Sequence, residues 1–251
     1  VIGASFRKRA TVMGTMTALW RVTCLLIPSM AVDAEARSTA HVSKIEADLR
    51  MLTDLRELGD GHNANDPAFA KLRDNLLAQY EVESVDELPI NFRGVVAQYS
   101  EAELTETLNR YADERMNNER GQSDRLLRFG WLSPALAVSN ASRSIAGTDL
   151  AHYHRFLRET ETLRFEFVQG LNAAHAEVLS YSNDINRNID AASGKRARIS
   201  ADNWSVLDEF NFVPDALRAR IAFAGATLTM LFSWFVVALL VMFVSGRRLQ
   251  P

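Results

Sequence analysis

The chain has 251 residues, 47% of them hydrophobic, and its 28 Lys and Arg side chains against 31 Asp and Glu give a net charge of −3. With 12 glycines and one cysteine, this composition excludes collagen-like, disulfide-rich and wholly disordered chains. All the acidic residues lie within 33–220, where 31 acids against 22 basic residues leave a net charge of −9. We therefore expect no nucleic-acid partner, because phosphate backbones bind basic surfaces.

The first predicted element is an apolar segment at residues 10–32, interpreted as a membrane-spanning helix of 23 residues. Arg21 lies near its middle, where an arginine costs roughly 2.5–3.5 kcal/mol, so this helix needs a partner helix, a protein surface or a route to the interface for the charge. Basic residues precede the segment at Arg7, Lys8 and Arg9. They predict a cytoplasmic N-terminal stub at residues 1–9. A cleaved signal peptide is the alternative, because small residues follow the apolar stretch.

Residues 33–213 are expected to form a helical domain on the far side of the membrane. An apolar stripe at helical spacing runs from Val42 to Leu58 and ends at a Gly-Asp-Gly break. Pro67 is expected to begin a second, short helix. The segment 85–98 is expected to be extended or irregular, because it contains Pro89 and Gly94. Ser100 and Glu103 have capping-box spacing, which predicts the start of a third helix.

The second half of this domain contains clear helix boundaries. Ser133 and Pro134 suit the N-cap and first position of a helix, which Gly147 ends. Thr148 or Asp149 then caps a long helix. Its predicted inner face consists of Tyr153, Phe156, Leu157, Leu163, Phe167, Leu171, Ala174, Val178 and Tyr181. Such stripes predict an all-α antiparallel bundle.

The end of the domain is expected to return the chain to the membrane. Residues 182–205 are polar and are interpreted as a loop. Trp204, Phe210 and Phe212 are typical of an aromatic cluster at a bilayer interface. Pro214 is expected to begin the helix that becomes the last span.

The final apolar stretch, residues 221–244, holds 24 residues without a charge. A helix of that length reaches about 36 Å, enough to cross the hydrocarbon core. We therefore predict a pre-membrane and transmembrane helix over 214–246, with a cytoplasmic tail at 247–251. Arg247 and Arg248 follow the span and place the C-terminus in the cytoplasm. The expected location is the inner membrane of a bacterium, with membrane lipid as a partner and both termini inside.

No motif in the sequence predicts catalysis, a metal site or a cofactor. His152 and His154 are two residues apart, so on a helix they point to opposite sides, whereas zinc helices space their ligands by four. They are interpreted as surface or packing histidines. Asp149 is explained as a helix cap. Gly194-Lys195 lacks the earlier glycine and the following hydroxyl of a phosphate-binding loop.

Several segments between residues 85 and 248 resemble the bacterial ABC-2-type transporter permease subunits that carry a large uncharacterised extracytoplasmic domain. The segments are Leu88 to Gly94 (LPINFRG), Leu132 to Ala137 (LSPALA) and Ala146 to His152 (AGTDLAH), with Phe156, Glu161, Phe210, Phe212, Pro214 and Trp234 beyond. The signature residues carried over are Pro89, Gly94, Ser133, Pro134, Gly147, Thr148, Asp149 and Phe156. Their expected role is structural.

The resemblance implies a transport subunit that works with a separate cytoplasmic ABC ATPase and with a second permease copy or another permease subunit. Hydrolysis then belongs to the ATPase, so no enzymatic activity is expected here. Such permeases usually have about six spans and this chain has two at most, so it is expected to be part of a permease or a split copy. A bitopic sensory or scaffolding protein with a ligand-binding helical domain is the alternative.

Overall fold

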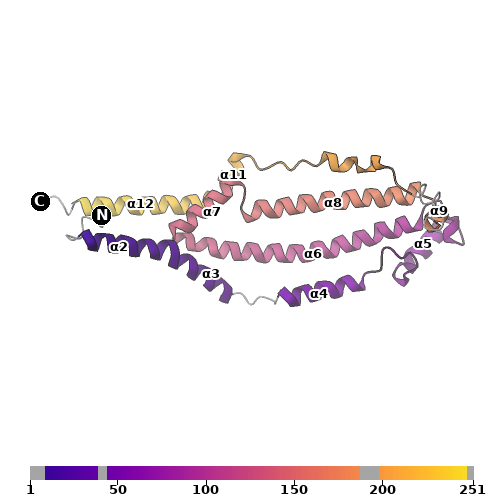
Figure 1. Ribbon diagram of the computed structural model, residues 1–251, viewed down its shortest axis with the longest axis horizontal. Helices are drawn as coiled ribbons and strands as arrows, with labels where there is room; N and C mark the ends of the chain where they lie inside the picture. The colour runs from indigo at the N-terminus through magenta and orange to yellow at the C-terminus, as the bar shows by residue number, and fades with distance from the viewer. Residues whose placement is uncertain (1–8, 39–43, 187–197, 248–251) are drawn as a thin grey trace. The chain divides into compact units, whose positions relative to one another are not determined.

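A computed structural model describes residues 9–38, 44–186 and 198–247, and every regular element in these ranges is helical (Figure 1). The all-α prediction is therefore confirmed. The chain divides into two compact units. Unit 1 comprises Val1–His41, Met116–Arg155 and Val213–Pro251, and unit 2 comprises Val42–Arg115 and Phe156–Phe212. Two helices, α6 (Phe92–Arg128) and α8 (Leu150–Val178), contribute residues to both units.

Unit 1 begins with one continuous helix in three parts: α2 (Arg9–Arg21), the π-helical turn η1 (Val22–Leu26) and α3 (Ile27–Ser38). The π turn has a cause in the sequence. Pro28 has no N–H, so the α-helical bond to the carbonyl of Cys24 cannot form. The N–H of Ile27 bonds instead to the carbonyl of Val22, one residue further back than in an α-helix.

The other elements of unit 1 lie around the short helix α7 (Pro134–Ala146). They are the 3-10 turn η4 (Phe129–Trp131), α11 (Leu217–Phe223) and α12 (Gly225–Arg247). α7 contacts η1, η4, α11 and α12, and Figure 1 shows it beside α12. Both predicted boundaries of α7 are confirmed by the structure. Ser133 accepts a hydrogen bond from the N–H of Leu136 at the N-terminal end, and Gly147 adopts a φ of 72° at the C-terminal end.

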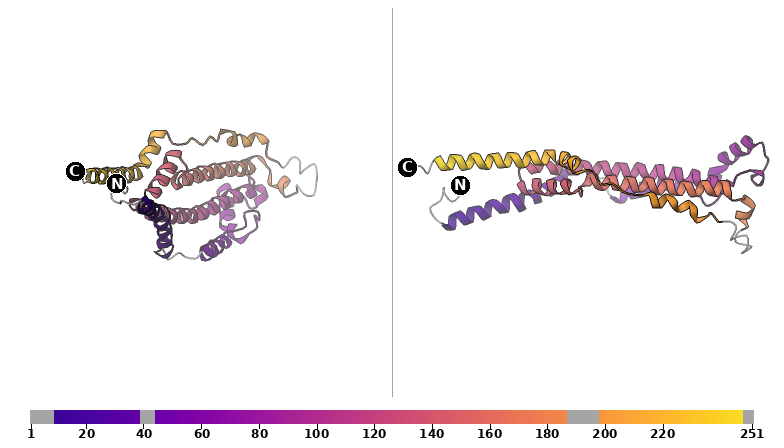
Figure 2. Two further views of the ribbon diagram at one scale, coloured as in Figure 1. Left: turned by 60° about the vertical axis from the view of Figure 1, so that its left-hand side comes forward. Right: turned by 90° about the horizontal axis from the view of Figure 1, so that it is seen from above.

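Unit 2 contains two long antiparallel helical segments from α6 and α8, which lie side by side in Figures 1 and 2. Contacts between them follow opposite chain directions. Asn91 pairs with Ala176, Gln98 with Gln169 and Glu101 with Arg164. The predicted antiparallel helical arrangement is thus present within this unit.

Shorter elements complete unit 2. They are α4 (Lys44–Glu57), η2 (Pro67–Phe69), α5 (Ala70–Tyr80), η3 (Val85–Glu87), α9 (Tyr181–Ile185) and η5 (Ala201–Glu209). The core is small and consists of Phe69, Leu88, Phe92 and Val96. The predicted helices that follow Val42 and Pro67 are confirmed by α4 and by η2 with α5.

Two predictions in the middle of the chain differ from the structure. The segment 85–98, predicted to be extended or irregular, is irregular only at 88–91, because η3 occupies its start and α6 begins at Phe92. Gly94 lies in the first turn of α6, where it packs closely against α8, as described below. Ser100 therefore lies inside a helix of 37 residues and does not begin one.

Two predictions near the end of the chain are also wrong. Pro214 does not begin a helix, since the chain stays non-helical until α11 begins at Leu217. The aromatic residues do not form one cluster, because Trp204 packs against Phe167 and Phe212 packs against Phe156. Part of the predicted loop is helical, in α9 and η5, and residues 187–197 lie outside the described ranges.

Candidate functional site

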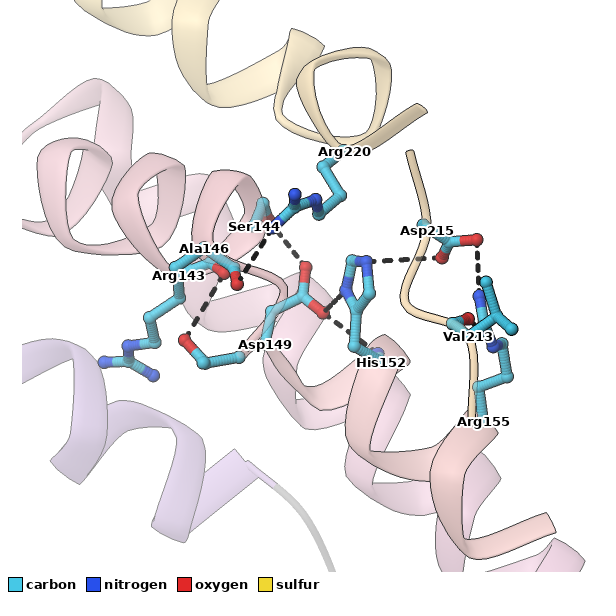
Figure 3. A network of polar contacts seen from close by, with 10 residues as sticks. Arg143, Ser144, Ala146, Asp149, His152, Arg155, Val213, Asp215 and Arg220 are labelled. Atoms are coloured by element: carbon cyan, nitrogen blue, oxygen red, sulfur yellow. Dashed lines mark hydrogen bonds and ion pairs between the residues drawn. The ribbon is translucent and has the colours of Figure 1, made fainter. Parts of the chain in front are cut away.

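The turn between α7 and α8 carries a network of polar contacts in unit 1 (Figure 3). The N–H of Gly147 donates to the carbonyl of Ser144 at 3.1 Å, and the N–H of Thr148 to that of Arg143 at 2.9 Å. These bonds satisfy the last carbonyls of α7. Gly147 has a positive φ, which favours glycine. An added Cβ would also lie 3.2 Å from Cδ of Arg220.

Asp149 caps the first turn of α8, as one of the two predicted alternatives. Its Oδ1 accepts the backbone N–H of His152 at 3.0 Å and lies 2.5 Å from Nδ1 of the same histidine. Its Oδ2 accepts the hydroxyl of Ser144 at 2.7 Å. Burial alone would raise the pKa of Asp149, but the hydrogen bonds from Ser144 and His152 outweigh it and lower that pKa.

The side chain of His152 lies between two carboxylates and is 6% exposed. While Nδ1 meets Asp149, Nε2 lies 3.3 Å from Oδ2 of Asp215, at ion-pair distance but outside hydrogen-bond geometry. The edge of the ring also packs against Phe223, with centroids 5.8 Å apart. Each ring nitrogen of His152 therefore faces a carboxylate, Asp149 at Nδ1 and Asp215 at Nε2.

Two arginines extend this network to the segment that precedes α11. Arg155 pairs with Asp215 and donates to the carbonyl of Val213. Arg220, on α11, donates to the carbonyl of Ala146 at 3.2 Å. The polar cluster therefore fastens the α7–α8 turn to the chain that leads into α12 (Figure 3).

The order of these groups does not suit nucleophilic catalysis. A serine nucleophile needs the histidine between itself and the carboxylate. Here the carboxylate of Asp149 lies between Ser144 and His152. Among the residues that the structure describes, no group of three or more His, Cys, Asp or Glu side chains is suited to hold a metal ion. The arrangement supports mechanical connection.

The apolar helices of unit 1 are joined by a second set of contacts. The hydroxyl of Ser133 donates to the carbonyl of Thr23 at 2.6 Å. From α12, the indole N–H of Trp234 donates to the carbonyl of Gly130 at 3.3 Å. Ala137 and Ala141 are buried on α7, which permits close approach of the neighbouring helices.

A bidentate ion pair joins the C-terminal end of the first apolar helix to α6. Nε and Nη2 of Arg125 lie 2.7 and 2.5 Å from the two carboxylate oxygens of Glu35. The side chain of Glu35 is 10% exposed. A charged pair this close to an apolar helix requires such geometry, because each charge loses hydration.

Unit 2 contains a separate buried polar cluster around Asp184, which is fully buried. Its Oδ2 lies 2.9 Å from Nε2 of His175 and accepts from Asn91 at 3.3 Å. Arg93 lies 3.6 Å away. Burial raises the pKa of Asp184, but His175, Arg93 and Asn91 together lower it below the ordinary value.

The predicted signature residues divide between the two units. In unit 1, Ser133, Pro134, Gly147, Thr148 and Asp149 form the two ends of α7 and the cap of α8. In unit 2, Gly94 lies against the backbone of Ala176, Pro89 lies in the bend before α6, and Phe156 packs on Phe212. Arg9 begins α2, and Arg247 ends α12 over the ring of Phe243. Arg7, Lys8 and Arg248 lie outside the described residues.

Of the two interpretations of His152 and His154, as surface or packing histidines, the structure supports packing, but sequence reasoning missed their carboxylate partners. It placed Tyr153 and Phe156 on the inner face of α8, yet they are 55% and 40% exposed, whereas His152 and His154 are buried. His154 lies 2.7 Å from Oε2 of Glu119, on the opposite side from the Asp149 cluster. The signal was the position of His152 three residues after a predicted cap. At that spacing the side chain can reach the capping carboxylate.

Comparison with known families places most of unit 2 and part of unit 1 in one match. Residues 44–213 match the family described as Domain of unknown function (DUF3526). No curated protein and no solved structure matches the chain.

Proposed function

The chain belongs to the DUF3526 family, through a match over residues 44–213, and we propose that it is a membrane-embedded, permease-type subunit of a bacterial ABC transporter. A separate ATPase subunit would hydrolyse ATP. The present chain would contribute two membrane-spanning helices and the helical DUF3526 region, and a second copy or another permease subunit would complete the transport path. The proposal rests on one observation about the helices that flank this region.

That observation is the exposure of two long apolar helices. Ala10–Arg37 and Gly225–Val244 are long and apolar enough to cross a membrane, and 0% and 11% of their apolar windows are buried. A core helix of a soluble protein would be mostly buried. Large side chains such as Trp20, Phe232 and Met242 are 56–65% exposed. Lipid or another membrane helix is the environment that such surfaces fit.

The position of Arg21 argues for a partner helix within the membrane. It is exposed and lies near the middle of Ala10–Arg37. An arginine at that depth is costly unless it faces a polar cavity or another helix. Two helices cannot enclose a solute path by themselves, so the same position argues for further permease helices.

The proposed orientation places both termini in the cytoplasm, from Arg7, Lys8 and Arg9 at one end and Arg247 and Arg248 at the other. It is tested with Cys24 replaced by alanine and single cysteines at Ser182 and Gly246. An added Cβ at Gly246 meets no atom within 4 Å. An impermeant maleimide is expected to label Ser182→Cys in intact cells and Gly246→Cys only after lysis. The reverse pattern would reject this orientation.

The transport role is tested by purification in mild detergent together with the products of the neighbouring genes. Recovery of a chain with nucleotide-binding motifs, in a constant ratio to this chain, is expected. Recovery of this chain without such a subunit, under conditions that keep a known ABC transporter intact, would reject the proposal.

A sensory or scaffolding protein is the second candidate, favoured by the fastening of Asp215 to His152 and Arg155. A ligand that altered this cluster would act directly on the chain leading into α12. Co-purification with a signalling protein, in the absence of an ATPase, would support this candidate over transport.

A further inference from the structure

We propose that the segment from the end of α6 through η4 and α7 re-enters the membrane beside the two apolar helices, with its tip at Gly130 to Ser133. The inference rests on the membrane insertion of those helices, which is part of the proposed function. It changes the expected topology, because sequence reasoning placed residues 33–213 entirely outside the bilayer.

The first argument is the position of two hydrogen bonds along the apolar helices. Ser133 bonds to Thr23, the fourteenth of the 28 residues of Ala10–Arg37. Gly130 bonds to Trp234, the tenth of the 20 residues of Gly225–Val244. The tip therefore meets both helices near their midpoints. If both helices cross the bilayer, this tip lies below the headgroups.

The length of α7 agrees with this depth. From its start beside Thr23 and Trp234, α7 has 13 residues and a rise of about 20 Å. At its other end, the carbonyl of Ala146 accepts from Arg220, which lies before the first residue of α12. The helix thus runs from the middle of the apolar helices to the charged residues outside them. Half a bilayer core is about 15 Å thick, so a tilted α7 covers that depth.

The composition of the segment suits the hydrocarbon region. The 14 residues from Phe129 to Ser142 carry no charge, and all but three serines and one asparagine are apolar. Predominantly apolar segments of about 10–14 residues are too short to span and suit re-entrant or interfacial positions. Trp131, Leu132 and Val138 are 51%, 57% and 51% exposed. We assign lipid chains as the occupant of this exposed face, because it continues the exposed apolar surface of the same unit.

Several polar backbone groups at the tip have hydrogen-bond partners, which membrane burial requires. The N–H groups of Leu132 and Ser133 both donate to the carbonyl of Phe129 at 2.9 Å. The carbonyl of Gly130 accepts the indole N–H, and Gly130 itself is buried. Ser133 both caps α7 and donates to Thr23. Arg128 is the charged residue nearest the tip, and its long exposed side chain can reach toward the headgroups.

The test measures the depth of spin labels in the full chain, with Cys24 replaced by alanine, reconstituted into phosphatidylethanolamine and phosphatidylglycerol vesicles. Labels are placed at Leu132→Cys and Val138→Cys. Phe232→Cys, 65% exposed on α12, is the lipid reference, and Ser182→Cys is the aqueous reference. Collision with oxygen, which concentrates in lipid, is compared with collision with a water-soluble nickel complex.

For labels at Leu132 and Val138 we expect the ratio of oxygen collisions to nickel collisions to match the ratio at Phe232 and to differ from the ratio at Ser182. Nickel-accessible labels at both positions, with Phe232 still in lipid, would overturn the re-entrant segment and leave the spans intact. Labels that neither reagent reaches would indicate that protein covers this face in place of lipid, and would reject the lipid-facing assignment. A nickel-accessible Phe232 would reject membrane insertion itself, and this inference with it.

Discussion

The hydroxyl of Ser133 donates a 2.6 Å hydrogen bond to the carbonyl of Thr23, across 110 residues of chain. The reason this carbonyl needs a donor lies in the first apolar helix. The N–H of Ile27 is bonded to Val22, and the next candidate donor would be residue 28, which is a proline without an N–H. Ser133 therefore supplies the donor that Pro28 removes.

This relationship predicts a coupling between Ser133 and Pro28. Ser133→Ala removes the donor to Thr23 and the N-cap of α7, and is expected to destabilise the chain by about 1–3 kcal/mol. Pro28→Ala restores an N–H for the helix. The cost of Ser133→Ala should therefore be smaller in the Pro28→Ala background than in the wild type.

The measurement is thermal unfolding in detergent for the two single variants and the double variant, with Ser142→Ala, an exposed serine of the same helix, as the control. The control is expected to change stability by less than about 0.5 kcal/mol. Strict additivity of Ser133→Ala and Pro28→Ala would contradict the explanation given for the π turn.

Asp149 is predicted to act as a cap and as an acceptor for Ser144 and His152. Asp149→Ala should cost about 2–4 kcal/mol, because it removes the cap and leaves buried polar groups without their acceptor. Asp149→Asn keeps a carbonyl oxygen for the N–H of His152, so its loss should be smaller. Circular dichroism melting of both variants measures the difference.

The control for these variants is Thr148→Ala, the exposed neighbour of the cap, which should melt close to the wild type. Equal melting temperatures for Asp149→Ala and Asp149→Asn would indicate that the charge of Asp149 matters and its capping oxygen does not.

The lowered pKa of Asp184 predicts a loss of stability in acid. Its folded-state pKa lies below the ordinary value of 3.8, so the ionised carboxylate stabilises the fold above the unfolded pKa. This contribution disappears as the pH falls through the folded pKa. Melting temperatures between pH 7 and pH 3 should therefore fall, with the Asp184 part appearing below about pH 4.

Asp184→Asn tests this assignment, because it keeps the size of the side chain and removes the titration. The variant should be less stable than the wild type at pH 7, and the difference should shrink toward pH 3. A constant difference across this range would show that the charge of Asp184 contributes nothing to stability.

Sequence patterns predicted the helices whose boundaries are set locally. Ser133, Pro134, Gly147 and Asp149 act on their own turns, so local chemistry was sufficient to place α7 and the start of α8. The start of α6 was missed because Gly94 has the appearance of a helix breaker. Only its contact with a helix far along the chain explains it.

The buried polar clusters lay beyond sequence reasoning for a similar reason. Arg125 and Glu35 are 90 residues apart, and Asn91 and Asp184 are 93 residues apart. No local spacing marks such pairs. The periodicity of α8 even favoured Tyr153 over the buried His152, because it gave more weight to hydrophobicity than to the partners that a histidine finds in the fold.

Gly94 offers the sharpest test of packing in unit 2. A Cβ at this position would lie 2.3 Å from the backbone nitrogen of Ala176 and 2.5 Å from its Cα, so α6 and α8 would have to separate. Gly94→Ala is expected to destabilise the chain by about 1–3 kcal/mol. Gly170→Ala, on α8, is the matched control, because its Cβ meets no atom within 4 Å. There the higher helix propensity of alanine should stabilise the chain by roughly 0.5–1 kcal/mol. Opposite shifts in melting temperature for these two substitutions are the expected result, and a Gly94→Ala variant as stable as the wild type would contradict the close approach of the two helices.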